Sequence, residues 1–302
     1  MGFIRELKKN WELFIMALPA VVLLFLFSYM PMAGIVIAFK NYQYMKGLFL
    51  SPWCGLSNFK FLFASNVAWQ ITKLTLGYNI IFIILGLILP VMLAIMFSEI
   101  DNAFLSKFYQ TVSIMPHFLS WVVMAYVGLA LLNNNGMMNT LIHMFGMKSI
   151  DWYNKVSFWP IILIFTNEWK TIGFNSIIYL ACICGISPEY YEAARLDGAS
   201  EWQQIKYITI PGLKMMMIIT TILALGHIFN SDFGLFYQMP MNQGQLFPAT
   251  ETIDVYVYNA LTSMNNINMS AAASVFQSIV GFITILIANG AIRKIEPDSA
   301  LF

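Results

Sequence analysis

The sequence predicts an all-α polytopic membrane protein with six transmembrane helices. Of its 302 residues, 59% are hydrophobic and only 10% are charged, whereas charged residues make up about a quarter of an ordinary soluble domain. Apolar runs of roughly 20 residues, long enough to cross a bilayer core about 30 Å thick, recur along the chain with polar segments between them. Three cysteines are too few for a disulfide scaffold, and 16 basic against 15 acidic residues provide no positive field for nucleic acid.

Each span is predicted from the borders of its apolar run. Residues 1–12 form a short polar segment, and residues 13–302 form one transmembrane domain. The first run is too long for the apolar region of a signal peptide and no small-x-small cleavage site follows it, so it is predicted to remain as a span. Prolines within the first four runs are typical of kinked membrane helices, whose neighbours satisfy the freed carbonyl groups. The six spans are expected at about 13–38, 71–97, 111–132, 158–186, 212–236 and 269–292.

Basic residues predict that both termini are cytoplasmic. With the N-terminus inside, the cytoplasmic segments carry Arg5, Lys8, Lys9, Lys107, Arg195, Lys206, Lys214, Arg293 and Lys294. The outside loops are longer but carry only Lys40, Lys46, Lys60, Lys148 and Lys155. This bias has the sign of the positive-inside rule, so the segment between the fourth and fifth spans is expected in the cytoplasm.

The segment 187–211 predicts two short helices joined at a glycine bend. Ser187 is a candidate N-cap, and Pro188 is suited to the first helical position. Asp197-Gly198 ends this helix, and Ser200 with Gln203 forms a capping box that starts the next one. Physical reasoning alone also allows a simple interpretation, in which the pair is an interfacial connector between two spans.

The same segment resembles a known motif. Glu192-Ala193-Ala194, then three residues, Gly198, then nine residues, Ile208, and finally Ile210-Pro211 resemble the EAA loop of binding-protein-dependent ABC importer permeases, with Ile210 where the family usually has leucine. The resemblance indicates coupling to an ATPase by residues of this loop, namely Glu192, Ala193, Ala194, Asp197, Gly198, Ala199, Ile208 and Pro211.

Further segments extend the resemblance over nearly the whole chain. Gly55-Leu56-Ser57-Asn58-Phe59 resembles a G-L-x-N-F signature that precedes the second span of sugar-importer permeases. Segments 115–123, 252–258 and 288–294 are similar to the LplB-like polysaccharide and oligosaccharide branch. The resemblance therefore implies the type I ABC importer permease fold, in a chain that crosses a bacterial cell membrane several times.

The resemblance also implies partners. Such permeases work in pairs, usually as heterodimers, with two ATPase subunits in the cytoplasm and a solute-binding lipoprotein outside that delivers an oligosaccharide. ATP and Mg²⁺ would be used by the ATPase subunits, and no cofactor is expected on this chain. This division of labour agrees with the sequence, which contains no G-x-x-x-x-G-K-[ST] phosphate loop.

Polar residues at membrane depth are the candidates for the path of the sugar. Carbohydrate sites use aromatic faces for stacking and amides or carboxylates for hydroxyl groups, and intramembrane polar groups are functional candidates by default. His227, Asn230 and Gly234 are expected to share one helix face. Interhelical hydrogen bonding is the alternative role for each of the candidates, which are Glu168, Trp169, Asn175, His227, Asn230 and Asp232.

Two other function classes find less support. A membrane enzyme acting on a lipid or glycan would need a catalytic constellation, yet Asp232 is the only aspartate within a predicted span. A channel would need a pore-lining ring or a filter loop, and no such pattern is evident. No histidine or cysteine spacing indicates a metal site.

Overall fold

The computed structural model describes residues 9–64 and 66–295, and these residues are helical apart from loops and one isolated antiparallel bridge between Lys40 and Trp53. Arg5, Lys8 and most of the predicted segment 1–12 lie outside the described residues. The chain divides into two compact units, which are described separately. Unit 1 is Met1–Ser65 with Val257–Phe276, and unit 2 is Asn66–Tyr256 with Gln277–Phe302.

Unit 1 begins with the first predicted span. Trp11–Phe39 is one apolar helical stretch, made of α2 (Trp11–Leu24), a π-helical turn (Phe25–Tyr29) and a 3-10 segment (Met30–Phe39). Pro19 lies inside α2 and Pro31 near the start of the 3-10 segment, where a missing N–H and a clashing ring favour irregular helix. The unit also contains α3 (Gly47–Leu50) and α4 (Lys60–Ala64).

The G-L-x-N-F segment closes the end of this first span. Asn58 donates from Nδ2 to the carbonyl oxygens of Ala38 and Lys40, at 2.9 Å each. These carbonyl groups have no partner further along the helix, so the amide acts as a C-terminal cap. Gly55 supplies a left-handed φ of 61°, and Phe59 packs with its ring centroid 5.5 Å from that of Phe39.

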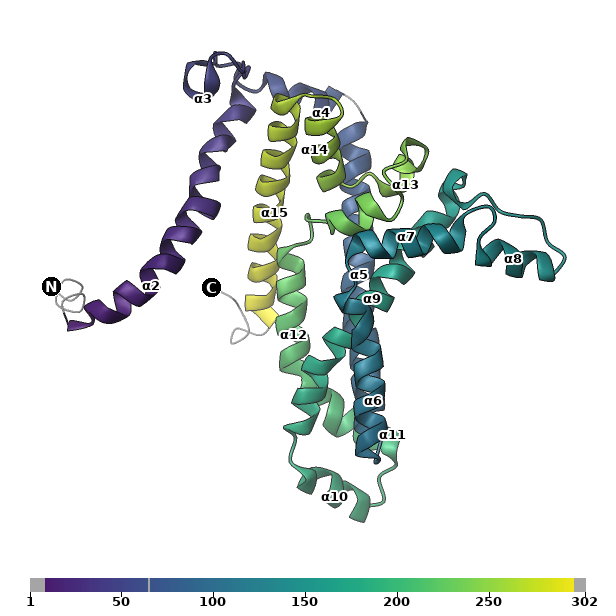
Figure 1. Ribbon diagram of the computed structural model, residues 1–302. Helices are drawn as coiled ribbons and strands as arrows, with labels where there is room; N and C mark the ends of the chain where they lie inside the picture. Colours follow the sequence, from purple (N-terminus) through teal and green to yellow (C-terminus); the bar gives the residue numbers. More distant parts are fainter. Residues whose placement is uncertain (1–8, 65, 296–302) are drawn as a thin grey trace. The chain divides into compact units, whose positions relative to one another are not determined.

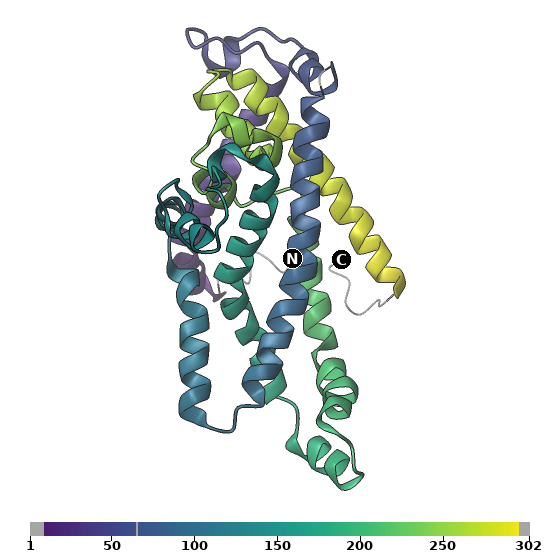
Figure 2. The same ribbon diagram turned by 90° about the vertical axis from the view of Figure 1, so that its right-hand side faces the viewer.

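Unit 2 is built on two long helices that pack along each other, α5 (Val67–Ser98) and α9 (Trp159–Cys184), as Figures 1 and 2 show. Tyr78 of α5 meets Phe236 edge to face at 4.8 Å, in a core that includes Trp159 and Leu163. A second cluster, with Leu213 buried between Val91 and Tyr179, joins both helices to α12 (Ile210–Gly226). The remaining helices of the unit are α6 (Ala103–Ile114), α7 (Trp121–Leu132), α8 (Met137–Met144), α10 (Pro188–Leu196), α11 (Glu201–Gln204) and α13 (Phe247–Thr250).

Two C-terminal helices each pass from one unit to the other. They are α14 (Ile253–Thr262) and α15 (Ile267–Ile295). Within the described residues, four helical stretches are long and apolar enough to cross a bilayer, and the number rises to six if two bent helix pairs are each counted as one span. The six predicted spans correspond to these six stretches, with two changes of shape.

The third predicted span, 111–132, is sharply bent, and the bend follows Pro116, one of the prolines for which the sequence predicts a kink. The chain bends by 96° between Ala103–Phe118 and Trp121–Met144. Pro116 cannot continue the helical hydrogen bonding, and Ser120 starts α7 by accepting a bond from the Val123 amide at 3.3 Å. Lys170 of α9 stabilises the break, because its Nζ donates to the carbonyl oxygens of His117 at 2.7 Å and Leu119 at 2.6 Å.

The fifth span ends earlier than the predicted 236, because α12 stops at Gly226. Beyond Gly226, side chains from other helices donate hydrogen bonds to carbonyl oxygens that would bond within the helix if α12 were longer. Asn79 donates to the carbonyl oxygens of Ile228 and Asn230, and Gln277 donates to that of Phe229. His227, Asn230 and Gly234 therefore do not share one helix face, which corrects the prediction from spacing.

Candidate functional site

The predicted coupling segment forms a helix–turn–helix that continues into α12. Figures 1 and 2 show α10 and α11 at one end of unit 2, and a π-helical turn (Ile205–Thr209) joins α11 to α12. The capping box is confirmed, since Ser200 and Gln203 bond each other's backbone amides. Ser187 occupies the N-cap position of α10, but its side chain makes no capping bond there. The π-helical turn lies directly before Pro211. In a regular α-helix the proline ring would clash with the carbonyl group of the preceding turn, and the wider π-helical turn relieves this clash.

Gly198 ends α10 in a Schellman motif. The Ala199 amide donates to the Ala194 carbonyl at 2.9 Å, and the Gly198 amide donates to the Arg195 carbonyl at 3.1 Å. This pattern places the glycine at φ 77°, a region where L side chains are strained. Nothing lies within 4 Å of an added Cβ at Gly198, so the backbone angle and not crowding is what requires glycine.

One hydrogen bond ties α10 to the start of α12. The hydroxyl groups of Tyr191 and Thr209 lie 2.9 Å apart, and Thr209 is buried. The Gln204 side chain also donates to the Ala199 carbonyl at 3.1 Å. The two short helices are therefore held as one element that is continuous with α12.

The predicted coupling residues fall into two groups. A hollow of about 290 Å³ lies in the bend. It is lined by Ala194, Asp197, Gly198, Ala199, Gln203, Gln204, Tyr207 and Ile208, which include five of the eight predicted residues. Glu192, Ala193 and Pro211 do not line this hollow and are exposed on the surface. Large exposed apolar side chains, such as Leu196 at 89% exposure, lie on the same element.

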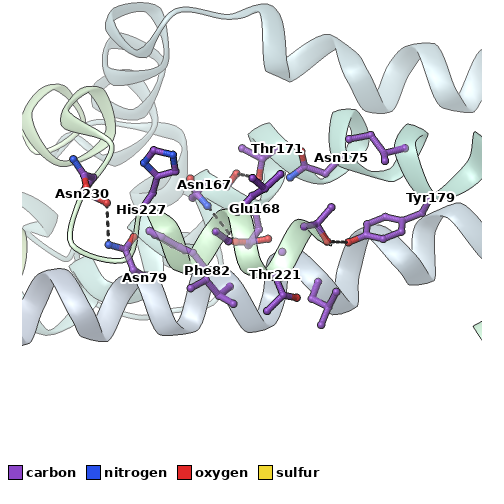
Figure 3. Close-up of a pocket in the computed structure, with 17 residues that line it drawn as sticks. Asn79, Phe82, Asn167, Glu168, Thr171, Asn175, Tyr179, Thr221, His227 and Asn230 are labelled. Carbon is purple, nitrogen blue, oxygen red and sulfur yellow. Dashed lines mark hydrogen bonds between the residues drawn. The ribbon is translucent and has the colours of Figure 1, made fainter. Parts of the chain in front are cut away.

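A second cavity, of about 440 Å³, lies between α5, α9 and α12 (Figure 3). Amide and hydroxyl groups face it from all three helices. Apolar side chains such as Phe82 and Leu223 form the rest of its wall. The polar lining residues are Asn79, Asn167, Glu168, Thr171, Asn175, Tyr179, Thr220, Thr221, His227 and Asn230.

Four of the six predicted path residues line this cavity, namely Glu168, Asn175, His227 and Asn230. Trp169 does not line it and is 44% exposed. Asp232 lies outside it as well, where its Oδ2 accepts a bond from the Trp121 indole at 2.8 Å and its Oδ1 accepts one from the Leu235 amide at 3.2 Å. These two bonds tie Asp232 to the start of α7 and to its own backbone segment.

The sequence reasoning missed other polar members of the wall. Asn79 lies in the middle of a strongly apolar span, which was a usable signal. Threonines give a weaker signal, because their hydroxyl groups commonly bond the carbonyl one helical turn back, as Thr171 bonds Asn167 and Thr221 bonds Met217. Asn167 precedes Glu168 in the same helix, and its Nδ2 donates to Glu168 Oε1 at 3.2 Å.

Lys170 makes no contribution to the cavity wall. It is buried, bonds the carbonyl groups of the α6–α7 break, and lies with its Nζ 5.2 Å from the centroid of the Trp121 ring. Glu168 and Lys170 are two positions apart on α9, so their side chains point to different faces of the helix. Among the described residues, no group of three or more histidine, cysteine, aspartate or glutamate side chains could hold a metal ion.

Comparison with known proteins identifies the family. Residues 83–298 match the family described as binding-protein-dependent transport system inner membrane component. The chain is 34% identical over 290 residues to the polygalacturonan/rhamnogalacturonan transport system permease protein YteP of Bacillus subtilis (strain 168). This alignment covers 96% of this chain and 90% of the relative. It is 27% identical over 299 residues to protein LplB of the same organism, covering 99% of this chain and 93% of that protein.

A solved structure has the same fold. It is a crystal structure of a bacterial ABC transporter involved in the import of the acidic polysaccharide alginate. A chain of that structure matches with a TM-score of 0.89 and 30% identity, over 98% of this chain and 100% of the other. The chain described here therefore belongs to the family of inner membrane components of binding-protein-dependent transport systems and is a multi-pass permease subunit.

Proposed function

We propose that this chain forms, with a second permease subunit, the translocation path of an ATP-driven importer for an oligosaccharide. A solute-binding lipoprotein outside the cell delivers the sugar, and two cytoplasmic ATPase subunits use ATP and Mg²⁺. The relatives support the sugar class, since one is a polygalacturonan/rhamnogalacturonan permease and a solved alginate importer was crystallised with a pentasaccharide-bound periplasmic protein.

The observation that carries the proposal is the continuity of Glu201–Gly226. This single helical stretch begins in the coupling segment and contributes Thr220, Thr221 and Ala224 to the wall of the polar cavity. A movement imposed on α10 and α11 would therefore displace one wall of the cavity. Such a rigid connection between two sites is what alternating access requires of a coupling element.

Within this proposal, residues of the loop have distinct tasks. Glu192 makes a polar contact to the ATPase, Ala193 permits its close approach, and the hollow around Gly198 receives part of the ATPase surface. The exposed Leu196, Trp202 and Tyr207 provide apolar area for the same contact, as the cores of protein interfaces do. The cavity residues Asn175, His227 and Asn230 bond sugar hydroxyl groups during passage.

A charge reversal tests the coupling. Glu192→Lys should leave the complex assembled in the membrane but abolish most of the stimulation of ATP hydrolysis by sugar-loaded binding protein, because it reverses a contact charge. Asp101→Lys makes the same charge change at an exposed position between α5 and α6 and should leave stimulation intact. Normal stimulation in the assembled Glu192→Lys complex would reduce the segment to a connector.

Cysteine labelling tests the proposed orientation, in which both termini are cytoplasmic. Gly244 and Asp197 are exposed and lie in segments predicted on opposite sides of the membrane. In a variant whose natural cysteines are replaced, an impermeant thiol reagent added to whole cells should label Gly244→Cys but not Asp197→Cys. The reverse pattern would overturn the orientation.

A further inference from the structure

Among the described residues that line the polar cavity, one is an aspartate, glutamate, lysine or arginine. Glu168 is that side chain, and the rest of the lining is amide, hydroxyl, imidazole or apolar. Lysine and arginine are absent from the described lining. The nearby Lys170 is engaged with the carbonyl groups of His117 and Leu119, outside the cavity.

The Glu168 carboxyl group is incompletely satisfied. The side chain is 7% exposed, Oε1 accepts one bond from Asn167, and Oε2 is buried with no hydrogen-bond partner among the residues that the structure describes. An unpaired carboxyl oxygen at membrane depth is costly, so its presence calls for a donor from elsewhere. Sugar hydroxyl groups are such donors, and their bonds to a carboxylate are charge-assisted.

We propose that, through Glu168, this wall admits saccharides without acidic groups and disfavours saccharides that contain uronate. The inference rests on the proposed function and narrows its substrate class. A uronate carboxylate in this cavity would face Glu168 with no cation from the described lining to compensate, and like charges in a poorly solvated site repel strongly. The expected cargo therefore differs in charge from the acidic polysaccharide of the alginate importer and from the polygalacturonan of the Bacillus subtilis permease, and those relatives support only the saccharide class.

Charged thiol reagents measure this preference without any sugar. Thr221 lines the cavity on α12 and is close in size to cysteine. In the purified complex with Cys54, Cys182 and Cys184 replaced by alanine, Thr221→Cys is treated at about pH 8, where histidine side chains are ordinarily neutral, with a cationic and an anionic methanethiosulfonate of similar size. The cationic reagent should react at least about fivefold faster than the anionic one, relative to the same ratio for a cysteine at the exposed Asn134.

Variants of Glu168 test whether this residue causes the difference in reaction rate between the cationic and the anionic reagent. Glu168→Gln in the Thr221→Cys background should bring the ratio down to that of the Asn134 control, whereas Glu168→Asp, which keeps the charge, should preserve it. The proposal is overturned if the ratio at Thr221→Cys equals the Asn134 ratio before Glu168 is changed, or if the anionic reagent reacts faster.

A matched pair of sugars separates this inference from the proposed function. The assembled transporter is offered α-1,4-galactotetraose and α-1,4-tetragalacturonate, which differ only in having CH₂OH or carboxylate at C6, and protection of Thr221→Cys from an uncharged thiol reagent is measured. Protection by the uncharged sugar alone supports both proposals, and protection by the uronate alone overturns the charge preference. A charge-dependent reagent ratio with no protection by either sugar supports the charge preference and counts against sugar passage through this cavity.

Discussion

The hydroxyl groups of Tyr191 and Thr209 meet at 2.9 Å, and this contact joins the EAA helix to the base of the helix that forms one cavity wall. Tyr191 belongs to α10 and Thr209 to the π-helical turn before α12. Without this hydrogen bond, α10 would be linked to α12 chiefly through the glycine bend and the short α11. Under the proposed function, we therefore expect this bond to set how rigidly a force on α10 reaches the cavity.

Tyr191→Phe should uncouple the two ends. Loss of one hydrogen bond costs only about 1 kcal/mol, so the complex should assemble and melt nearly as wild type does. Sugar-stimulated ATP hydrolysis should fall several-fold, and transport per ATP should fall with it. Tyr190→Phe, at a neighbouring exposed tyrosine, is the control and should behave as wild type. Unchanged transport per ATP in Tyr191→Phe would show that the bend alone transmits the movement.

Gly198 provides a graded test of the bend. At φ 77°, a β-branched residue is an outlier, whereas asparagine tolerates the left-handed region. Gly198→Val should lose coupled ATP hydrolysis, with a strain of roughly 1–2 kcal/mol on the segment, and Gly198→Asn should retain most of it. Equal activity of the two variants, measured in reconstituted complexes, would contradict a role for the backbone angle, because there is space for either side chain around the Cβ.

Local signals predicted the coupling segment well. The capping box at Ser200 and the glycine stop depend on residues within a few positions of one another, so the sequence contains all of the information. Pro116 is a local signal for the bend before α7, but Lys170, which bonds the Leu119 carbonyl there, is 51 positions away, and no local pattern reveals that partner. The early end of α12 likewise depends on Asn79 and Gln277, which come from two other helices.

The cavity was predictable in composition but not in outline. Glu168, Asn175 and His227 stood out because polar groups are rare in apolar runs, and they do line one cavity. Asp232 stood out for the same reason, but its actual partner is an indole N–H at the start of a helix that the sequence predicted as the middle of a span.

Substitutions at Asn230 and Asp232 should therefore have different effects, one on sugar uptake and the other on thermal stability. Asp232→Leu removes the acceptor of the Trp121 indole and of the Leu235 amide, so the complex should lose about 1–3 kcal/mol of stability and melt several degrees lower. Asn230→Leu should reduce sugar uptake without lowering the melting temperature, because the side chain is exposed and lines the cavity.

Trp121→Phe serves as the matched variant, since it removes the other partner of the same bond. It should reproduce the thermal loss of Asp232→Leu, and the double variant should melt at nearly the same temperature as either single one. If Asp232→Leu melts like wild type and fails only in uptake, Asp232 belongs to the sugar path after all.

Glu251 gives a prediction about pH. It lies between α13 and α14, outside the membrane-spanning stretches, and burial raises the pKa of its carboxyl group above the ordinary value of 4.5. Burial also raises the pKa of the nearby Tyr256 hydroxyl to about 12, with the charge of Glu251 as a second cause. The folded protein thus tolerates the protonated carboxyl better than the ionised one.

The sign of the effect follows from proton linkage. Between 4.5 and its raised pKa, Glu251 holds a proton in the folded state that it has lost in the unfolded state. Its contribution to stability is therefore full below 4.5 and declines as the pH rises through the folded-state pKa. Glu251→Gln cannot ionise, so it should melt progressively higher than wild type as the pH rises, with the gain levelling off once the wild-type carboxyl is ionised.

The exposed Glu189→Gln is the control and should show a smaller change with pH. Melting curves of the purified complex from about pH 4 to pH 8 measure this difference, and a gap between Glu251→Gln and wild type that does not vary with pH would contradict the assignment.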